Sequence, residues 1–194
     1  MKNALIGTNI TLRPASPGDD DLLFELYASS RAPEMALLTD WSHKQKQDFL
    51  RSQFEAQHSH YHQHYPDADY DLILKEGKPI GRFYVDRMPA EIRLMDITLL
   101  DQYRNQGIGS LLMKCLFDEA EGGNQWVSLH VEENNPAMQL YQRLGFVEVG
   151  EVTFYKLMHW HASPQQPKRS ETIRAVNKQA KNITEANVVL DEML

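Results

Sequence analysis

The chain has 194 residues, 42% of them hydrophobic and 24% charged, and its 27 acidic and 20 basic side chains give a net charge of −7. This balance is that of one ordinary globular domain and excludes a wholly disordered chain. The pI of about 5.6 argues against a nucleic-acid-binding protein, and the single cysteine, Cys115, excludes a disulfide framework and a multi-cysteine zinc site. No apolar run approaches a signal peptide or the ~20 residues of a membrane span, so we expect a soluble cytoplasmic protein with no membrane partner.

The first third of the chain predicts one strand and two helices. Alternating polar and apolar side chains over residues 8–13 predict the strand. Ser16 and Asp19 have the spacing of a capping box and predict the start of the first helix. Ser42 and Gln45 repeat that spacing and predict the start of the second.

The middle of the chain changes to strand periodicity and then back to helix. Residues 70–74 and 80–85 predict a hairpin, and residues 91–100 predict a third strand. Residues 108–117 carry their apolar side chains on one face and predict a helix, which should end at Gly122-Gly123.

The last third predicts a strand over residues 126–131, a helix from Asn135-Pro136 to Gly145, and two strands around Gly150. After Trp160 the composition becomes polar. We therefore expect one domain over residues 1–160, followed by a linker and a helical tail over residues 161–194. The tail would serve as an oligomerisation or docking arm, which allows for a homodimer.

A glycine-containing turn, Arg104-x-x-Gly107-x-Gly109, lies between the third of these strands and the helix that follows it. Glycines let the backbone approach a ligand closely, and a helix start offers free N–H groups to an anion. The turn is not a Walker loop, and Leu112 replaces the third glycine of a dinucleotide fingerprint. Taken alone, the pattern fits a pyrophosphate cradle or a simple tight turn.

A second segment follows about thirty residues later and reads Asn135-Pro136-Ala137-x-x-Leu140-Tyr141-x-x-Leu144-Gly145-Phe146. Together, the two segments resemble the signatures of the GNAT superfamily of acetyl-CoA-dependent N-acetyltransferases, and the resemblance covers residues 8–160. It implies an α/β (α+β) fold with a mixed, mostly antiparallel sheet of six to seven strands. The sheet would be splayed in the middle and flanked by about four helices.

The resemblance also implies a reaction. The acetyl group of acetyl-CoA would pass directly to a primary amine of a small molecule or peptide in a ternary complex, without a metal. In the family the acceptor pocket is built from segments that correspond here to residues 27–41 and 61–70. The alternative is a non-catalytic acyl-CoA-binding module whose tail docks a partner protein.

The implied cofactor-binding residues lie on the splayed strand, in the glycine turn and before the last helix: Ile97, Thr98, Leu99, Arg104, Asn105, Gln106, Gly107, Ile108, Gly109, Ser110, Asn134 and Asn135. Backbone N–H groups near Leu99 would hold the oxyanion. Asn135 is also a natural helix cap, and Asn134 is the alternative ligand.

Tyr141 matches the tyrosine that protonates the departing thiolate, and its alternative role is that of a packed core side chain. Asp96 and Glu91 are the candidates for the base. Asp96 lies in an apolar run, where burial would raise its pKa, or it is a hydrogen-bonded structural carboxylate. Glu91 would otherwise be a solvated strand end.

Alternating histidines between residues 58 and 64 form two i,i+4 pairs on different helix faces. Such pairs can bind a metal, but no carboxylate or cysteine lies beside them at ligand spacing, which favours a solvated or substrate-lining helix end. Cys115 lies on an apolar helix stripe and is expected in the core.

Overall fold

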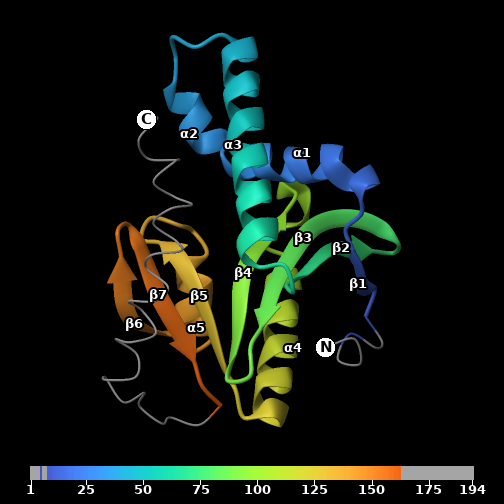
Figure 1. Ribbon diagram of the computed structural model, residues 1–194, viewed down its shortest axis with the longest axis vertical. Helices are drawn as coiled ribbons and strands as arrows, with labels where there is room; N and C mark the ends of the chain where they lie inside the picture. Colours follow the sequence, from blue (N-terminus) through green and yellow to red (C-terminus); the bar gives the residue numbers. More distant parts are fainter. Residues whose placement is uncertain (1–4, 6–7, 163–194) are drawn as a thin grey trace.

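A seven-stranded sheet in the order β1-β2-β3-β4-β5-β7-β6 forms the centre of the computed structural model, which describes Leu5 and residues 8–162 (Figure 1). The strands are β1 (Ile10–Pro14), β2 (Asp69–Lys75), β3 (Lys78–Arg87), β4 (Glu91–Leu99), β5 (Trp126–Glu132), β6 (Val147–Val152) and β7 (Tyr155–Trp160). Within the described residues the α-helices are α1 (Asp20–Ser30), α2 (Ala32–Leu37), α3 (His43–His64), α4 (Ile108–Gly123) and α5 (Met138–Arg143). All strand pairs are antiparallel except β4 with β5. This confirms the predicted mixed sheet, with five α-helices in place of about four.

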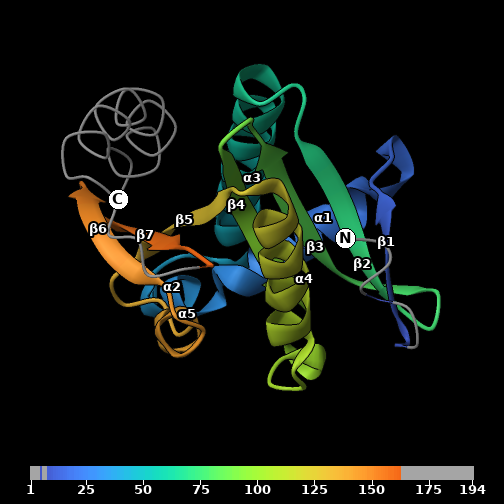
Figure 2. The same ribbon diagram turned by 90° about the horizontal axis from the view of Figure 1, so that it is seen from below.

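Helices cover both faces of the sheet and create two hydrophobic cores. The helices α4 and α5 lie on one face, where Leu112 and Leu116 are fully buried. The helices α1, α2 and α3 lie on the other, where Leu26 and Phe54 are buried (Figure 2). The sheet is thus buried on both sides, so a ligand reaches its centre only where two strands separate.

Both predicted capping boxes are present. The Ser16 amide donates to the Asp19 carboxylate at 2.8 Å, and this box starts a 3-10 turn (Pro17–Asp19) that continues into α1. The Ser42 hydroxyl accepts from the Gln45 amide at 3.3 Å and starts α3. Because each box satisfies otherwise unpaired N–H groups, these two helices begin where the sequence predicts.

One local prediction was wrong, and one short helix was missed. We expected the last two strands to meet around Gly150, but Gly150 lies inside β6 at a register shift, and the turn falls at Thr153, which has φ 55°. A β-bulge absorbs the extra residue and leaves the strand intact. The short helix α2 was not predicted, because its six residues show no clear period.

The sheet opens between β4 and β5. Their ladder joins Glu91–Leu94 to Trp126–Leu129 and stops there, and the two halves of the sheet diverge beyond that point (Figure 1). The opening coincides with a bulge, since Tyr84 pairs with Asp96 and Val85 with Leu94, which leaves Met95 as the extra residue of β4. A bulge increases local twist and bends the strand, and this turns β4 away from β5. The predicted splay is confirmed.

The predicted linker and tail lie outside the described residues, apart from His161 and Ala162. In the described part of the chain, no helix is both long and apolar enough to cross a membrane.

Candidate active site

The start of α4 has the backbone geometry of an anion cradle. Asn105 and Gly107 have φ of 57° and 80°, so the chain turns through the left-handed region and enters α4 at Ile108. A Cβ placed on Gly107 would meet no described atom within 4 Å, so the space above the turn is open. No described side chain caps this helix start, and the N–H groups of the first turn, from Ile108 to Ser110, have no partner within the helix. Such groups bind phosphate oxygens.

Two cations flank the cradle. The Arg104 guanidinium donates to the Leu99 carbonyl at 3.0 Å and pairs with Asp101 at 2.9 Å, which ties the turn to the end of β4. Lys75, at the end of β2, donates to the Gln106 side chain at 3.0 Å. Lys75 was missed in the sequence because two strands, β3 and β4, separate it from the turn along the chain.

The predicted pantetheine-binding residues Ile97, Thr98 and Leu99 lie on β4 beyond the last β5 pair. Their other edge is held by β3, where Gly81 pairs with Leu99. A Cβ on Gly81 would lie 2.4 Å from the Thr98 carbonyl, so only glycine allows the strands to approach this closely. Pairing with β3 thus holds one edge of this part of β4, and the other edge faces the gap between β4 and β5.

Tyr141 lies on α5 and is only 7% exposed, with its ring 5.7 Å from that of Phe146. Burial and the charge of Asp96 both raise its pKa. The phenol therefore keeps its proton at neutral pH and can donate it. Asn135 is not the N-cap of α5 as expected, because that helix begins at Met138 and its N-cap is Ala137. The Asn135 side-chain oxygen instead accepts from the Ala137 amide at 2.9 Å in the turn before the helix, and both Asn134 and Asn135 are exposed.

Asp96 does not have the apolar surroundings that the sequence suggested. Its two oxygens accept from the buried Arg82 guanidinium at 3.1 and 2.7 Å, and one of them also accepts from the Thr98 hydroxyl at 2.8 Å. Because the Met95 bulge turns Asp96 toward Arg82 of β3, this pairing depends on the strand register. The geometry favours the structural alternative for Asp96.

Glu91 is not a solvated strand end, since it is buried at the start of β4. Its carboxylate accepts from Arg93 at 3.0 Å and from the Ser128 hydroxyl. Glu91 pairs with Trp126 in the closed half of the sheet, so it lies outside the splay. Its neighbours give it a structural role in joining β4 to β5.

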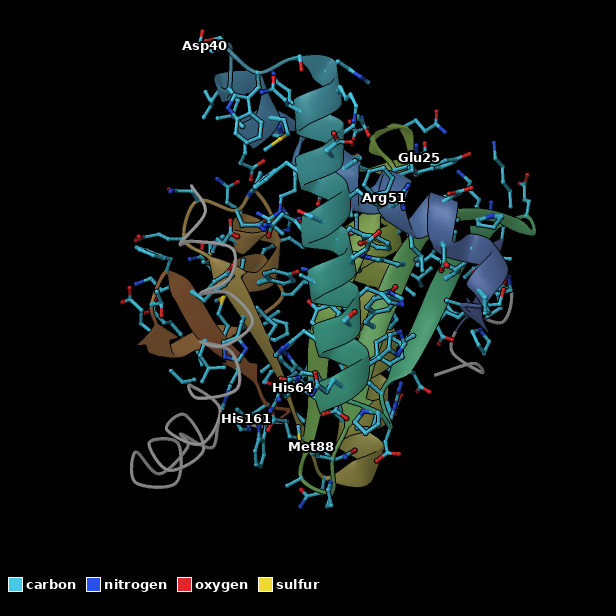
Figure 3. All side chains as sticks on the ribbon, turned by 45° about the horizontal axis from the view of Figure 1, so that its top comes forward. Glu25, Asp40, Arg51, His64, Met88 and His161 are labelled. Atoms are coloured by element: carbon cyan, nitrogen blue, oxygen red, sulfur yellow. The ribbon has the colours of Figure 1, made fainter. Side chains whose placement is uncertain are left out.

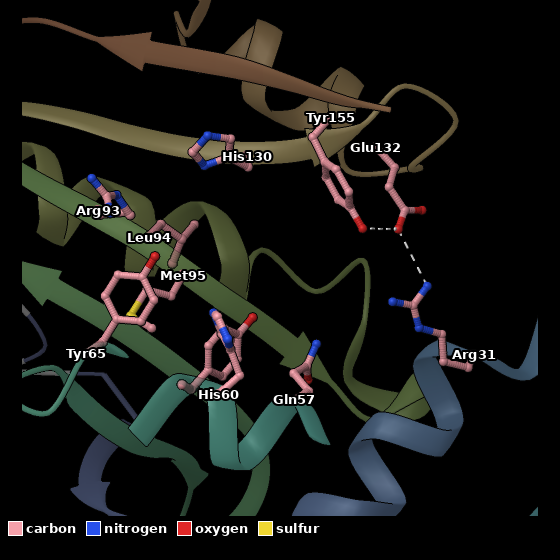
Figure 4. A pocket seen from close by; sticks show the side chains of 11 residues that line it. Arg31, Gln57, His60, Tyr65, Arg93, Leu94, Met95, His130, Glu132 and Tyr155 are labelled. Carbon is pink, nitrogen blue, oxygen red and sulfur yellow. Dashed lines mark hydrogen bonds and ion pairs between the residues drawn. The ribbon is translucent and has the colours of Figure 1, made fainter. Parts of the chain in front are cut away.

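A cavity of about 160 Å³ opens at the splay on the α3 face (Figure 4). Its walls come from residues that are distant in the sequence: Arg31 after α1; Gln57, His60, Tyr61 and Tyr65 from or beside α3; Arg93, Leu94 and Met95 from β4; His130 and Glu132 from β5; and Tyr155 from β7. Arg31, Tyr61 and Tyr65 fall within the two segments expected to build the acceptor pocket.

Three side chains of the cavity wall, those of Arg31, Glu132 and Tyr155, are linked by an ion pair and a hydrogen bond. Glu132 accepts from the Tyr155 hydroxyl at 3.1 Å and pairs with Arg31 at 3.5 Å, as Figure 4 shows. Neither His130 nor Glu132 was predicted. The sequence signal that could have found them is their spacing of two residues on a central strand, because this spacing places both polar side chains on one face of β5.

The α3 histidines divide as expected between two faces. His60 lines the cavity and stacks on His64 at 4.0 Å, whereas His62 packs on Tyr70 at 4.2 Å. Figure 3 shows α3 in front of the sheet, with His64 and His161 toward the same end of the molecule. Among the described residues, no three histidine, cysteine or carboxylate side chains could together hold a metal ion. Cys115 is buried, which raises its pKa and fits a core role.

Comparison with known proteins gives one family. The family model described as Acetyltransferase (GNAT) family matches residues 32–146, more than half of the chain. The chain is 35% identical over 78 residues to the ribosomal protein bS18-alanine N-acetyltransferase of Haemophilus influenzae. That match covers 40% of this chain and 53% of the relative. It is also 35% identical over 75 residues to the mycothiol acetyltransferase of Thermobifida fusca, with 38% of this chain and 20% of the relative covered. The chain thus spans about half, or less, of these curated relatives.

Solved structures share the fold at low sequence identity. The PaiA N-acetyltransferase of Thermoplasma acidophilum, solved with coenzyme A, has a TM-score of 0.59 at 19% identity and covers 78% of this chain and 98% of its own. The spermidine N-acetyltransferase of Vibrio cholerae, solved with CoA and spermine, has a TM-score of 0.52 at 19% identity and covers 78% and 93%.

Proposed function

Since the chain belongs to the GNAT acetyltransferase family, we propose that it transfers the acetyl group of acetyl-CoA directly to a primary amine within a ternary complex. The observation that carries this proposal is the splay between β4 and β5. The splay has an anion cradle beside β4 at the start of α4, and a cavity on the α3 face. Two substrates that enter from these two sides would meet between the strands.

The cradle residues fit the pyrophosphate of CoA. The free N–H groups of Ile108, Gly109 and Ser110 would bind its oxygens, and Asn105, Gln106 and Gly107 would shape the turn around it. Arg104 would supply positive charge. Ile97, Thr98 and Leu99 would bind the pantetheine arm through their backbone, with Asn134 or Asn135 opposite them across the splay.

Tyr141 would act as the general acid that protonates the leaving sulfur. The position of its phenol on α5, buried and protonated at neutral pH, supports this role. Asp96 stays a candidate base, although both of its oxygens are engaged by Arg82 and Thr98. We expect its main effect to be electrostatic, because its charge, second to burial, raises the pKa of Tyr141.

The acceptor would be the amine end of a small molecule or peptide. The cavity of about 160 Å³ is smaller than the ~300–1,000 Å³ that hold a whole drug-sized ligand. It therefore fits one aminoalkyl group or one chain terminus. The similar proteins, by their names, act on an alanine of a ribosomal protein and on spermidine, which is consistent with either class.

The test of this mechanism compares Tyr141→Phe with Tyr84→Phe, after an acceptor has been found in a panel of polyamines, amino acids, aminoglycosides and peptide N-termini. Tyr84 is a matched control, because it is buried, has a pKa raised mainly by burial, and lies outside the cavity. We expect Tyr141→Phe to lower kcat by roughly 10²–10⁴-fold with unchanged acetyl-CoA affinity. Tyr84→Phe should keep kcat within about twofold of wild type.

Near-wild-type turnover by Tyr141→Phe would remove Tyr141 from the mechanism and leave water as the proton source. The alternative function, a non-catalytic acyl-CoA-binding module, predicts tight acetyl-CoA binding with no acetylated product from any amine in the panel. Formation of an acetylated amine therefore distinguishes the acetyltransferase from the binding module.

A further inference from the structure

His130 occupies the point at which the sheet opens. The last pair between β4 and β5 joins Leu94 to Leu129, so His130 is the first residue of β5 beyond the closed half. Its backbone is still held on the other side by β7, where it pairs with Leu157. Figure 4 shows its ring at the cavity, between Arg93 and Tyr155. Pairing with β7 thus holds β5 so that the His130 imidazole faces the cavity at the splay.

The Nε2 atom of His130 is buried and has no hydrogen-bond partner within the described chain. Among the cavity-lining residues it is the one described side chain with such an atom. Glu132, two residues later on the same face, is already bound by Arg31 and Tyr155. Buried polar atoms almost always have partners in folded proteins, so an unpaired nitrogen at the wall of a cavity indicates a missing ligand.

The surroundings of His130 keep its ring neutral. Burial and the positive charge of Arg93 on β4 lower its pKa to about 4, and His159 on β7 acts in the same direction. Glu91 on β4 opposes them but is itself bound to Arg93. From α3, His60 and the protonated phenol of Tyr61 also line the cavity. At neutral pH the imidazole therefore has a lone pair to offer.

We propose that His130 accepts the proton that the acceptor amine loses during acetyl transfer. This rests on the proposed function and names the base of that reaction. The amine nitrogen bonds to the acetyl carbon, the carbon–sulfur bond breaks, the amine proton moves to His130 Nε2, and Tyr141 gives its proton to sulfur. Solvent then takes the proton from His130 and restores that of Tyr141.

The low basicity of His130 sets the order of events. The amine must arrive uncharged, because a weak base does not deprotonate a free ammonium ion. Once nitrogen has bonded to the acetyl carbon, its proton becomes far more acidic and a neutral imidazole can accept it. Asp96 and Glu91 are each engaged by an arginine, Glu132 is engaged by Arg31 and Tyr155, and His60 stacks on His64. The unpartnered buried nitrogen of His130 therefore favours this side chain as the acceptor at the splay.

The test compares His130→Gln with His159→Gln. His159 is the matched control, because it is buried, has an unpaired nitrogen and a pKa lowered to about 4, yet it lies outside the cavity. We expect His130→Gln to lower kcat by roughly 10²–10⁴-fold, with acetyl-CoA affinity within about twofold of wild type. His159→Gln should keep wild-type kcat within about twofold at neutral pH. In a His130→Ala protein, added imidazole should restore turnover.

Wild-type turnover by His130→Gln would overturn the inference, and so would equal losses in both glutamine variants. If His130→Gln does not fold, the imidazole response of folded His130→Ala decides the matter: rescue supports the proposal and its absence overturns it. If the wild-type protein acetylates no amine, the proposed function fails first and this inference fails with it.

Discussion

Acid should destabilise the folded protein through His130 and His159, because the partly buried ring of His130 and the buried ring of His159 are both held without charge. The pKa of each is about 4 in the folded protein, and burial is the main cause. In the unfolded chain a histidine has a pKa of ~6.5. Between these values the unfolded state binds more protons than the folded state. Stability is therefore complete above about pH 6.5 and is lost as the pH falls toward 4.

The size of the effect follows from these two pKa values. Between about pH 7.5 and about pH 5, a histidine shifted in this way loses about 2 kcal/mol of folding free energy. The two rings together should therefore cost about 3–4 kcal/mol, since their charges interact and His130 is only partly buried. Asp19, whose pKa is lowered by its bond with Arg13, titrates in a more acidic range and does not contribute here.

Urea unfolding at these two pH values measures the loss directly. In His159→Gln the loss should shrink by about 2 kcal/mol, the share of that one ring, while His130 and the lowered pKa values of His58 and His161 still contribute. Gln keeps a polar side chain in this buried position, where His159 stacks with Trp126. An equal loss in the variant and in wild type would refute the assignment of the acid sensitivity to these rings.

Three substitutions probe the substrate sites. Gly107→Val should abolish acetyl-CoA binding by calorimetry, since a β-branched residue is strained at φ 80° and would fill the open space above the turn. A folded variant with wild-type affinity would contradict the cradle. Gly81→Ala should lower stability by about 1–3 kcal/mol in thermal unfolding, because its Cβ would lie 2.4 Å from the Thr98 carbonyl. Unchanged stability would contradict the claim that only glycine allows β3 and β4 to approach this closely. Arg31→Ala should raise the acceptor KM about tenfold and leave the acetyl-CoA KM unchanged, because Glu132 loses its positioning partner. Parallel changes in both KM values would argue against an acceptor role for the cavity.

Local signals in the sequence predicted the parts of the structure that depend on neighbours along the chain. The capping boxes at Ser16 and Ser42 satisfy N–H groups three residues away, and both helices begin there. The glycine turn likewise depends on backbone angles within a few residues of Gly107. Such features predict well because no distant residue has to be placed first.

The parts that were mispredicted or missed depend on strand register. Asp96 sits in an apolar run of the sequence, but the Met95 bulge turns it onto Arg82 of the neighbouring strand. Glu91 is likewise buried by its contact with Ser128, which follows from the β4–β5 pairing.

The cavity is assembled from even more distant parts. Arg31 and Glu132, 101 positions apart, meet at its wall. No period or motif in one sequence encodes such a contact.

Acetyl transfer itself is the central claim, and mass spectrometry of an amine panel incubated with acetyl-CoA tests it most directly. We predict that at least one primary amine gains a single acetyl group, with free CoA thiol released in equal amount and only when that amine is present. Tight acetyl-CoA binding without an acetylated amine anywhere in the panel would contradict the account and favour a binding module.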